Sequence, residues 1–311
     1  MNPRHYLHNF VRAFTGPRPA WRLASKSRVL ANALSDRIRD AGEKFRDDET
    51  SHNEKPIFIL SAGWRTGSTL LQRMMMELND DLLMWGEPFE RANMFEGMSN
   101  QFRGFTKDWP NAEFFLDASE SRRLSQRWVA NLYPNTEEFV AAHRAFFNTL
   151  FGVPARRIGY SSWGVKEVRL TADHARYIRL IYPCARIIFL CRDPREAYVS
   201  YRAWFEAWFR EWPDRVVATP RAFGANWAEL MSGFLDVCEE VGAIIVRYED
   251  LNNEAEVSRI SKYVGRRMVR ARDLEKIGST KRKKQYHDIP LIDRALLEWK
   301  AGAVMRRSGY K

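Results

Sequence analysis

The chain of 311 residues is long enough for one α/β domain, and 45% of its residues are hydrophobic, which supplies a sizeable core. With 29% charged residues and a mean hydropathy of -0.48, the composition excludes a protein embedded in a membrane. The formal net charge of +11 favours anionic partners, but charge alone does not choose between nucleotides, nucleic acid, acidic glycans and anionic lipids.

The first 54 residues are predicted to be a basic arm and a polar linker, and residues 55–311 the catalytic domain. The first acidic residue is Asp36, and arginines and aromatic residues are interleaved before it. Such an arm suits peripheral membrane contact, an organellar presequence or packing on the domain, and these alternatives stay open. No apolar run reaches the ~18 residues of a membrane span, and no secretory signal core is seen, so a cytoplasmic protein is expected.

The three cysteines are widely spaced and form no CxxC pair: Cys184, Cys191 and Cys238. An odd number of separated cysteines predicts free thiols in a reducing compartment. We therefore expect no structural metal, and no other cluster of metal-ligating residues stands out.

The first predicted elements are a strand and a helix joined by a tight loop. Residues 56–62 are a short apolar run, and residues 68–78 carry apolar side chains at helical spacing. Between residues 93 and 157 the apolar positions lose any strand rhythm, which predicts a helical insertion. Helices are expected in it over residues 122–131 and 136–150.

Strands and helices alternate after the insertion. This alternation predicts a P-loop-like, three-layer α/β fold whose central, mostly parallel sheet is flanked by helices. The expected strands cover residues 163–166, 185–191 and 243–247, and the expected helices cover residues 171–182, 194–209, 221–241, 254–264 and 291–305.

The loop over residues 61–69 has the properties of a phosphate-binding loop. A glycine-flanked turn between a strand and a helix exposes backbone N–H groups at the positive end of the helix dipole. Gly67 permits close approach of an anion, Arg65 adds a forked cation, and Thr66, Ser68 and Thr69 add hydroxyl donors. The loop departs from GxxxxGK[ST] because no lysine follows Gly67, which favours a ligand other than a nucleoside triphosphate. Small polar turns before helices are also common N-caps.

A second anion site is predicted where the strand over residues 185–191 ends. Arg192 follows that strand, and Ser200 lies about two turns into the next helix, so both can reach the carboxyl edge of the sheet. Alternatively, Arg192 pairs with Asp193 or Glu196 and has no role in binding.

Taken together, the segments FILSAGWRTGSTLL and FLCRDPREAYVSYRAW resemble the two nucleotide-binding motifs of the sulfotransferases that use 3′-phosphoadenosine 5′-phosphosulfate (PAPS). The resemblance continues with WGVKE at residues 163–167 and RYEDL at residues 247–251, and it spans the chain from about residue 55 onward, outside the insertion.

The resemblance implies a role for several residues. It assigns the 3′-phosphate to Arg192 and Ser200, and it places Tyr248 near the adenine. Its 5′-phosphosulfate site would comprise Arg65, Thr66, Gly67, Ser68 and Thr69. A basic loop clamps the 3′-phosphate in this family, for which Lys281 and Arg282 are the best local match; Lys283 and Lys284 are alternatives, and the run can also be a solvated loop.

Sulfuryl transfer needs a base for the acceptor hydroxyl and cations for the leaving oxygen. Glu87 resembles the catalytic glutamate of carbohydrate, tyrosyl-protein and bacterial glycolipid sulfotransferases, although it can instead pair with Arg91. His143 is the reserve base. Lys166 and Arg65 would stabilise the leaving oxygen, unless Lys166 pairs with Glu167.

The resemblance thus implies a sulfotransferase with PAPS as donor, no metal, and a hydroxyl acceptor on a glycan, a glycolipid or another small molecule. Aromatic residues over 201–212 are expected to pack in the core or, with Trp109 and Phe114, to stack on the acceptor. The alternatives are a Mg²⁺-dependent P-loop kinase and a noncatalytic basic protein that binds nucleic acid or membranes. We expect no nucleic-acid partner, since the basic residues are spread along the chain.

Overall fold

The computed structural model describes residues 54–88, 94–105, 110–116, 124–126, 129–202, 216–274 and 289–311. The basic arm up to residue 53, and the segment 203–215 with most of the aromatic run, therefore lie outside the described residues. The same holds for Arg91, Trp109, Lys281, Arg282, Lys283 and Lys284.

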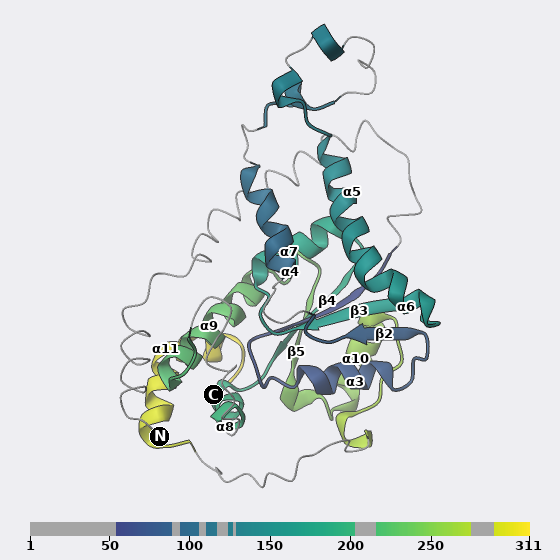
Figure 1. The fold of residues 1–311 in the computed structure, drawn as a ribbon. Coiled ribbons are helices and arrows are strands. Elements are labelled where there is room, and N and C mark those ends of the chain that lie inside the picture. The colour runs from purple at the N-terminus through teal and green to yellow at the C-terminus, as the bar shows by residue number, and fades with distance from the viewer. Residues whose placement is uncertain are drawn as a thin grey trace, which may run out of the picture.

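A five-stranded parallel sheet forms the centre of the fold, with strand order β2-β3-β1-β4-β5 (Figure 1). The strands are β1 (Ile57–Ser61), β2 (Leu82–Trp85), β3 (Ser162–Glu167), β4 (Arg186–Cys191) and β5 (Ile244–Arg247). β1 and β4 are short and almost entirely buried, as parallel strands covered on both faces must be. The predicted α/β class with a parallel sheet between helices is confirmed.

The two faces of the sheet carry separate apolar cores because successive strand residues point to opposite sides. Phe58 and Leu60 of β1 face a large core that includes residues of α7 (Ala172–Ile181), α9 (Pro220–Val237) and α11 (Leu291–Arg307). Ile57 and Ile59 face the other core, covered by α3 (Ser68–Met76) and α10 (Glu254–Val264). Figure 1 shows these two groups of helices on opposite sides of the strands.

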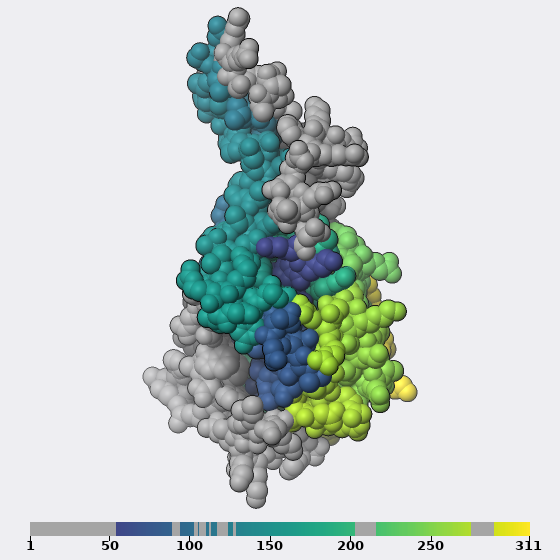
Figure 2. Space-filling model, turned by 90° about the vertical axis from the view of Figure 1, so that its right-hand side faces the viewer, coloured from purple at the N-terminus to yellow at the C-terminus, as the bar shows by residue number. Residues whose placement is uncertain are grey.

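The predicted insertion is helical in its described parts. It contains α4 (Met94–Ser99), α5 (Thr136–Phe147), a π-helical turn η7 (Asn148–Gly152), α6 (Val153–Arg157) and the short 3₁₀ turns η3 (Asn100–Gly104), η4 (Ala112–Phe114) and η6 (Val129–Asn131). α5 begins with a capping box formed by Asn135 and Glu138. In Figures 1 and 2, α5 and the short turns beyond it extend away from the sheet.

The helix predicted over residues 122–131 is not α-helical in its described part. Residues 124–126 and η6 form 3₁₀ turns instead. η6 contains no buried residue, and Val129 is 54% exposed, so no apolar face packs there to stabilise a regular α-helix.

Candidate functional site

The parallel sheet brings the carboxyl ends of all five strands to one edge, where ligands bind in open α/β folds. The strand register pairs Ile59 with Lys166 and Ser61 with Leu190, so β1, β3 and β4 end side by side. The sequence-predicted site residues follow these strands or lie at their last positions. They are Arg65 after β1, Glu87 after β2, Lys166 in β3, Arg192 after β4 and Tyr248 after β5.

The loop after β1 has an unusual backbone. Gly63 and Gly67 both have φ of 91°, and Arg65 is the one non-glycine residue with positive φ in the described part of the chain, at 65°. Such a conformation costs a non-glycine residue of order 1 kcal/mol or more, and residues held in strained conformations cluster at active sites and ligand-binding loops.

Gly67 is required at the start of α3. A Cβ atom there would lie 2.2 Å from a ring carbon of Tyr248, so any larger residue would collide with the ring. Gly67 is also the N-cap of α3, and no side chain caps the helix there. The N–H groups at this positive helix end are thus suited to bind an anion.

The loop hydroxyls differ in their surroundings. Thr66 is buried, and its hydroxyl donates a hydrogen bond of 3.2 Å to the Gly63 carbonyl, so this side chain braces the loop itself. Ser68 is buried at the start of α3, whereas Thr69 is exposed. The sequence predicts all three hydroxyls as ligand donors, and the structure gives that of Thr66 an internal partner.

Trp64 anchors the loop to α8 (Pro194–Arg202). Its ring stacks on that of Tyr201, with centroids 5.7 Å apart and the planes inclined by 14°. Tyr201 belongs to the aromatic run of the sequence, and it is buried in the core, as the packing interpretation requires. This contact holds the loop after β1 against the helix after β4.

The predicted donor-binding residues lie together. Arg65 Nε donates to the Ser200 hydroxyl at 3.0 Å, and Arg192 Nη1 donates to the Arg65 carbonyl at 3.2 Å. The Arg192 guanidinium lies over the Tyr248 ring, 4.4 Å from its centroid. Burial, and then repulsion by Arg192, lower the pKa of Arg65. Two neighbouring guanidinium groups of this kind favour an anion between or beside them.

The alternative that Arg192 only forms an ion pair receives little support from the geometry. Its contact with Glu196 is long, at 3.6 Å, and the Glu196 side chain is 61% exposed. Asp193 pairs with Arg195 instead, at 2.6 Å. An exposed ion pair of this kind contributes little to stability.

Glu87 and Lys166 meet on the other side of β1. Lys166 Nζ donates to Glu87 Oε1 at 2.6 Å, and Arg169 Nη2 donates to Glu87 Oε2 at 3.2 Å. Lys166 and Arg169 are buried, whereas 26% of the Glu87 side chain stays exposed. Lys166 therefore pairs with Glu87 and not with its neighbour Glu167. The two cations hold both carboxylate oxygens of Glu87 in position.

Glu167 joins this group through Arg169, whose Nη1 donates to Glu167 Oε1 at 3.2 Å. The same oxygen accepts the backbone N–H of Val168 at 2.8 Å. Burial raises the pKa of Glu167 to about 7, Arg169 opposes this effect, and the charge of Glu87 adds to it. Glu87, Lys166, Glu167 and Arg169 thus form one charged cluster, which we call the transfer cluster.

His143, the reserve base, lies in an aromatic environment. It is 2% exposed on α5, its Nδ1 lies 2.8 Å from the Tyr177 hydroxyl, and its ring packs against Phe102 and Phe139. Burial lowers the pKa of His143 to about 4, so the ring is neutral at pH 7. These partners belong to the helical layer and not to the strand ends.

Sequence reasoning did not identify several residues that support the site. Arg169 holds Glu87, Asn226 lies beside Gly63, and Glu249 and Tyr310 hold the turn after β4. A usable signal existed for Arg169, because Lys166, Glu167 and Arg169 place three charges at the end of an otherwise apolar strand. The described residues include no group of three or more metal-ligating side chains and no helix with the length and apolar character to cross a membrane.

Comparison of the sequence with known families gives a match. The model of the sulfotransferase family matches residues 56–269, which is more than half of the chain. No curated protein matches the sequence significantly.

Several solved structures are similar to the chain at low identity. The sulfotransferase domain of the Synechococcus PCC 7002 olefin synthase is 16% identical, with a TM-score of 0.46 over 86% of this chain and 98% of that domain. The sulfotransferase domain from the curacin biosynthetic pathway is 15% identical, with a TM-score of 0.44 over 84% and 99%. Sulfotransferase STF9 from Mycobacterium avium is 11% identical, with a TM-score of 0.44 over 93% and 86%.

Proposed function

The chain belongs to the sulfotransferase family, and on this premise we propose that it moves a sulfuryl group from PAPS to a hydroxyl of a glycan or glycolipid. The observation that carries the proposal is the 2.6 Å contact between Glu87 and Lys166, on the sheet edge that also carries Arg65 and Arg192. A proton acceptor, a cation and an anion-binding loop are the three components that such a transfer needs.

The donor residues fit a nucleotide that carries anionic groups at two positions. At the 5′ end, the absence of a side chain on Gly67 and the uncapped start of α3 leave backbone donors for an anion. At the 3′ end, Arg192 Nε is buried without a hydrogen-bond partner in the described part of the chain, and an acceptor oxygen would satisfy it. When bound, PAPS supplies the activated sulfuryl group.

In this proposal, the transfer cluster acts on the acceptor hydroxyl and the leaving oxygen. Glu87 accepts the hydroxyl proton, and Arg169 keeps its second oxygen oriented. Lys166, together with Arg65, stabilises the charge that grows on the leaving phosphate oxygen. Because Lys166 is buried, its charge acts more strongly than it would in water.

The acceptor class is inferred from the base. A glutamate base resembles that of the carbohydrate, tyrosyl-protein and bacterial glycolipid sulfotransferases, whereas the His143 ring is buried among aromatic side chains. We therefore prefer a glycan or glycolipid hydroxyl, the acceptor of two of these three classes, over the phenol of a tyrosine.

Donor identity can be tested by calorimetry with adenosine 3′,5′-bisphosphate and, separately, ATP with Mg²⁺. We expect the bisphosphate to bind more tightly, because the loop has no lysine after Gly67 and because Arg65 and Arg192 can donate hydrogen bonds to phosphate oxygens. Preference for ATP with Mg²⁺ would contradict the proposed donor and favour a kinase.

Acceptor identity can be tested by incubation with ³⁵S-labelled PAPS and separate glycan, glycolipid and phenolic acceptors. We expect the wild-type protein to transfer label to a glycan or glycolipid. The Glu87→Gln variant should transfer none. Label on the phenol alone would contradict the acceptor class and leave the donor assignment intact.

A further inference from the structure

The peptide bond between Arg192 and Asp193 is held from both sides. The Arg192 carbonyl accepts a hydrogen bond of 3.1 Å from Trp227 Nε1 on α9. The Asp193 N–H donates a hydrogen bond of 2.8 Å to Glu249 Oε1, in the short turn after β5. Because these two groups belong to one peptide plane, the contacts fix the direction in which the backbone carries the Arg192 side chain.

Tyr310 contacts both residues that hold this peptide. Its hydroxyl donates to Glu249 Oε2 at 3.1 Å, and its ring lies edge-on to Trp227, with centroids 6.1 Å apart. Tyr310 is 4% exposed, and the Arg247 guanidinium lies 4.4 Å from its ring centroid. Burial raises the pKa of Tyr310, so its hydroxyl remains a donor at neutral pH.

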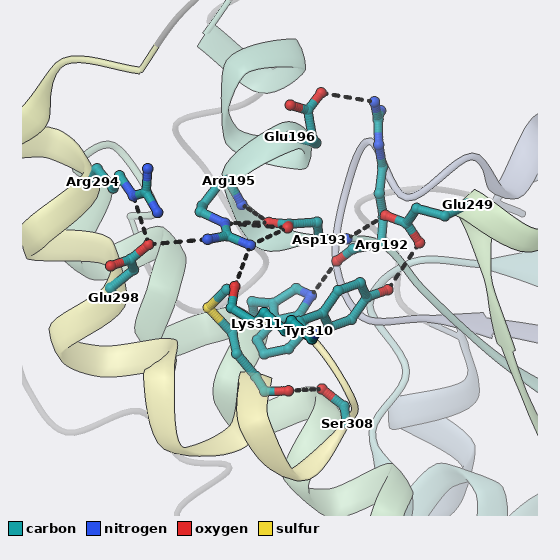
Figure 3. A network of polar contacts seen from close by, with 12 residues as sticks. Arg192, Asp193, Arg195, Glu196, Glu249, Arg294, Glu298, Ser308, Tyr310 and Lys311 are labelled. Atoms are coloured by element: carbon teal, nitrogen blue, oxygen red, sulfur yellow. Dashed lines mark hydrogen bonds and ion pairs between the residues drawn. The ribbon is translucent and has the colours of Figure 1, made fainter.

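Figure 3 shows that the neighbouring residues support the same turn. Arg195 donates to both carboxylate oxygens of Asp193, at 2.9 Å and 3.1 Å from Nε. Arg195 also donates to the Lys311 carbonyl at 2.8 Å and pairs with Glu298 of α11 at 3.3 Å. The segment after α11 is thus attached directly to the turn that carries Arg192.

We propose that Tyr310 is a positioning residue that gives the site its selectivity for a nucleotide with a 3′-phosphate. It acts through Glu249 and Trp227 on the Arg192 peptide and touches no ligand itself. This inference rests on the proposed function, in which Arg192 binds the 3′-phosphate. A guanidinium that is oriented before binding gives up less conformational freedom when the phosphate arrives.

The test compares two nucleotides in two tyrosine variants of the full chain. Adenosine 3′,5′-bisphosphate carries the 3′-phosphate, and adenosine 5′-phosphosulfate lacks it. Tyr310→Phe removes the hydroxyl and keeps the ring. The matched control is Tyr263→Phe, because the Tyr263 hydroxyl donates to the Ile187 carbonyl at 3.1 Å, at the other end of β4.

We expect Tyr310→Phe to weaken binding of the bisphosphate about tenfold, the effect of losing one hydrogen bond to a charged group, and to leave binding of the phosphosulfate unchanged. Trp227→Phe, which removes the other contact to the peptide, should have an effect of the same kind. Tyr263→Phe should leave the affinity ratio of the two nucleotides at its wild-type value.

The inference would be overturned if Tyr310→Phe kept the wild-type affinity ratio, either by leaving both affinities unchanged or by weakening both equally, as the loss of a purely structural contact would. In either case, retained selectivity in the wild-type protein would leave the proposed donor standing. A wild-type protein that bound both nucleotides equally would overturn the proposed donor and this inference together.

Discussion

The two halves of the site differ in the contacts that the described residues make with their cations. In the transfer cluster, Lys166 and Arg169 both contact the Glu87 carboxylate, and Arg169 also contacts Glu167, all within 3.2 Å. In the donor half, Arg65 donates to the Ser200 hydroxyl and Arg192 to a backbone oxygen, and the carboxylate that lies near Arg192 among the described residues is exposed and 3.6 Å away.

This difference suggests separate tasks. A balanced cluster is oriented before any ligand arrives, because its charges already hold one another in place. A pair of arginines that repel each other is stabilised by an added anion. We therefore expect changes in the transfer cluster to alter the rate of transfer, and changes in the donor half to alter donor affinity.

The largest expected effect is on the transfer rate of Glu87→Gln. The amide keeps the size of the side chain but cannot accept the hydroxyl proton, so kcat should fall about 100- to 10,000-fold. Asp81→Asn is the matched control, since Asp81 pairs with Arg266 at 2.5 Å near the start of β2, away from the strand ends that carry the site. A fall of kcat in the control equal to that of Glu87→Gln would contradict the role of Glu87.

Arg192→Ala should mainly weaken donor binding. Loss of this guanidinium should reduce the affinity for adenosine 3′,5′-bisphosphate about 100-fold, while kcat at saturating donor changes much less. Arg186→Ala offers a comparison, because Arg186 lies at the amino end of the same strand and packs on Tyr263. Calorimetry measures the affinity of both variants. Unchanged affinity in Arg192→Ala would contradict the assignment of the 3′-phosphate to this site.

Glu167 should make stability depend on pH. Its pKa is about 7 in the folded protein, compared with an ordinary value of 4.5, so the folded state holds a proton that the unfolded chain releases between these pH values. The unfolding free energy should therefore fall, by on the order of 2 kcal/mol from this group, as pH rises from about 4.5 through 7. Urea unfolding of Glu167→Gln should lack that contribution, and an unchanged pH profile would show that Glu167 is charged throughout.

The smallest expected effect on catalysis is that of His143→Gln, whose kcat should equal that of the wild-type protein. In the wild-type protein, burial lowers the pKa of His143 to about 4. The neutral ring therefore contributes to the free energy of unfolding above about pH 6.5, and this contribution is lost as pH falls toward 4. The variant should lose less stability than the wild type over that range. A large fall of kcat at neutral pH would instead make His143 the base.

Much of the fold was predictable from local pattern. The helix over residues 254–264 was predicted with the observed bounds, because Asn253 caps its start and Gly265 ends it in the left-handed conformation. The ends of β3, β4 and β5 were placed within about one residue, since buried parallel strands are largely apolar runs, whereas β2 was not among the expected strands. The motif residues of the donor half were likewise named from the sequence.

The partners of the charged residues were not predictable in the same way. Glu87 meets Lys166 across 79 positions of sequence, and Tyr310 meets Glu249 across 61, so only the folded sheet brings them together. The sequence also predicted that the Thr66 hydroxyl binds the ligand, whereas in the structure this hydroxyl donates to the Gly63 carbonyl. Local pattern predicts elements, whereas such contacts depend on topology.

The separation of the two halves is tested most directly by measuring donor affinity and single-turnover rate on one variant, Glu87→Gln. We expect it to bind adenosine 3′,5′-bisphosphate as tightly as the wild-type protein does, while its rate of sulfuryl transfer from PAPS falls by at least about 100-fold. A parallel loss of affinity and rate, or a rate that stays at the wild-type value, would contradict the assignment of Glu87 and its cluster to the transfer step.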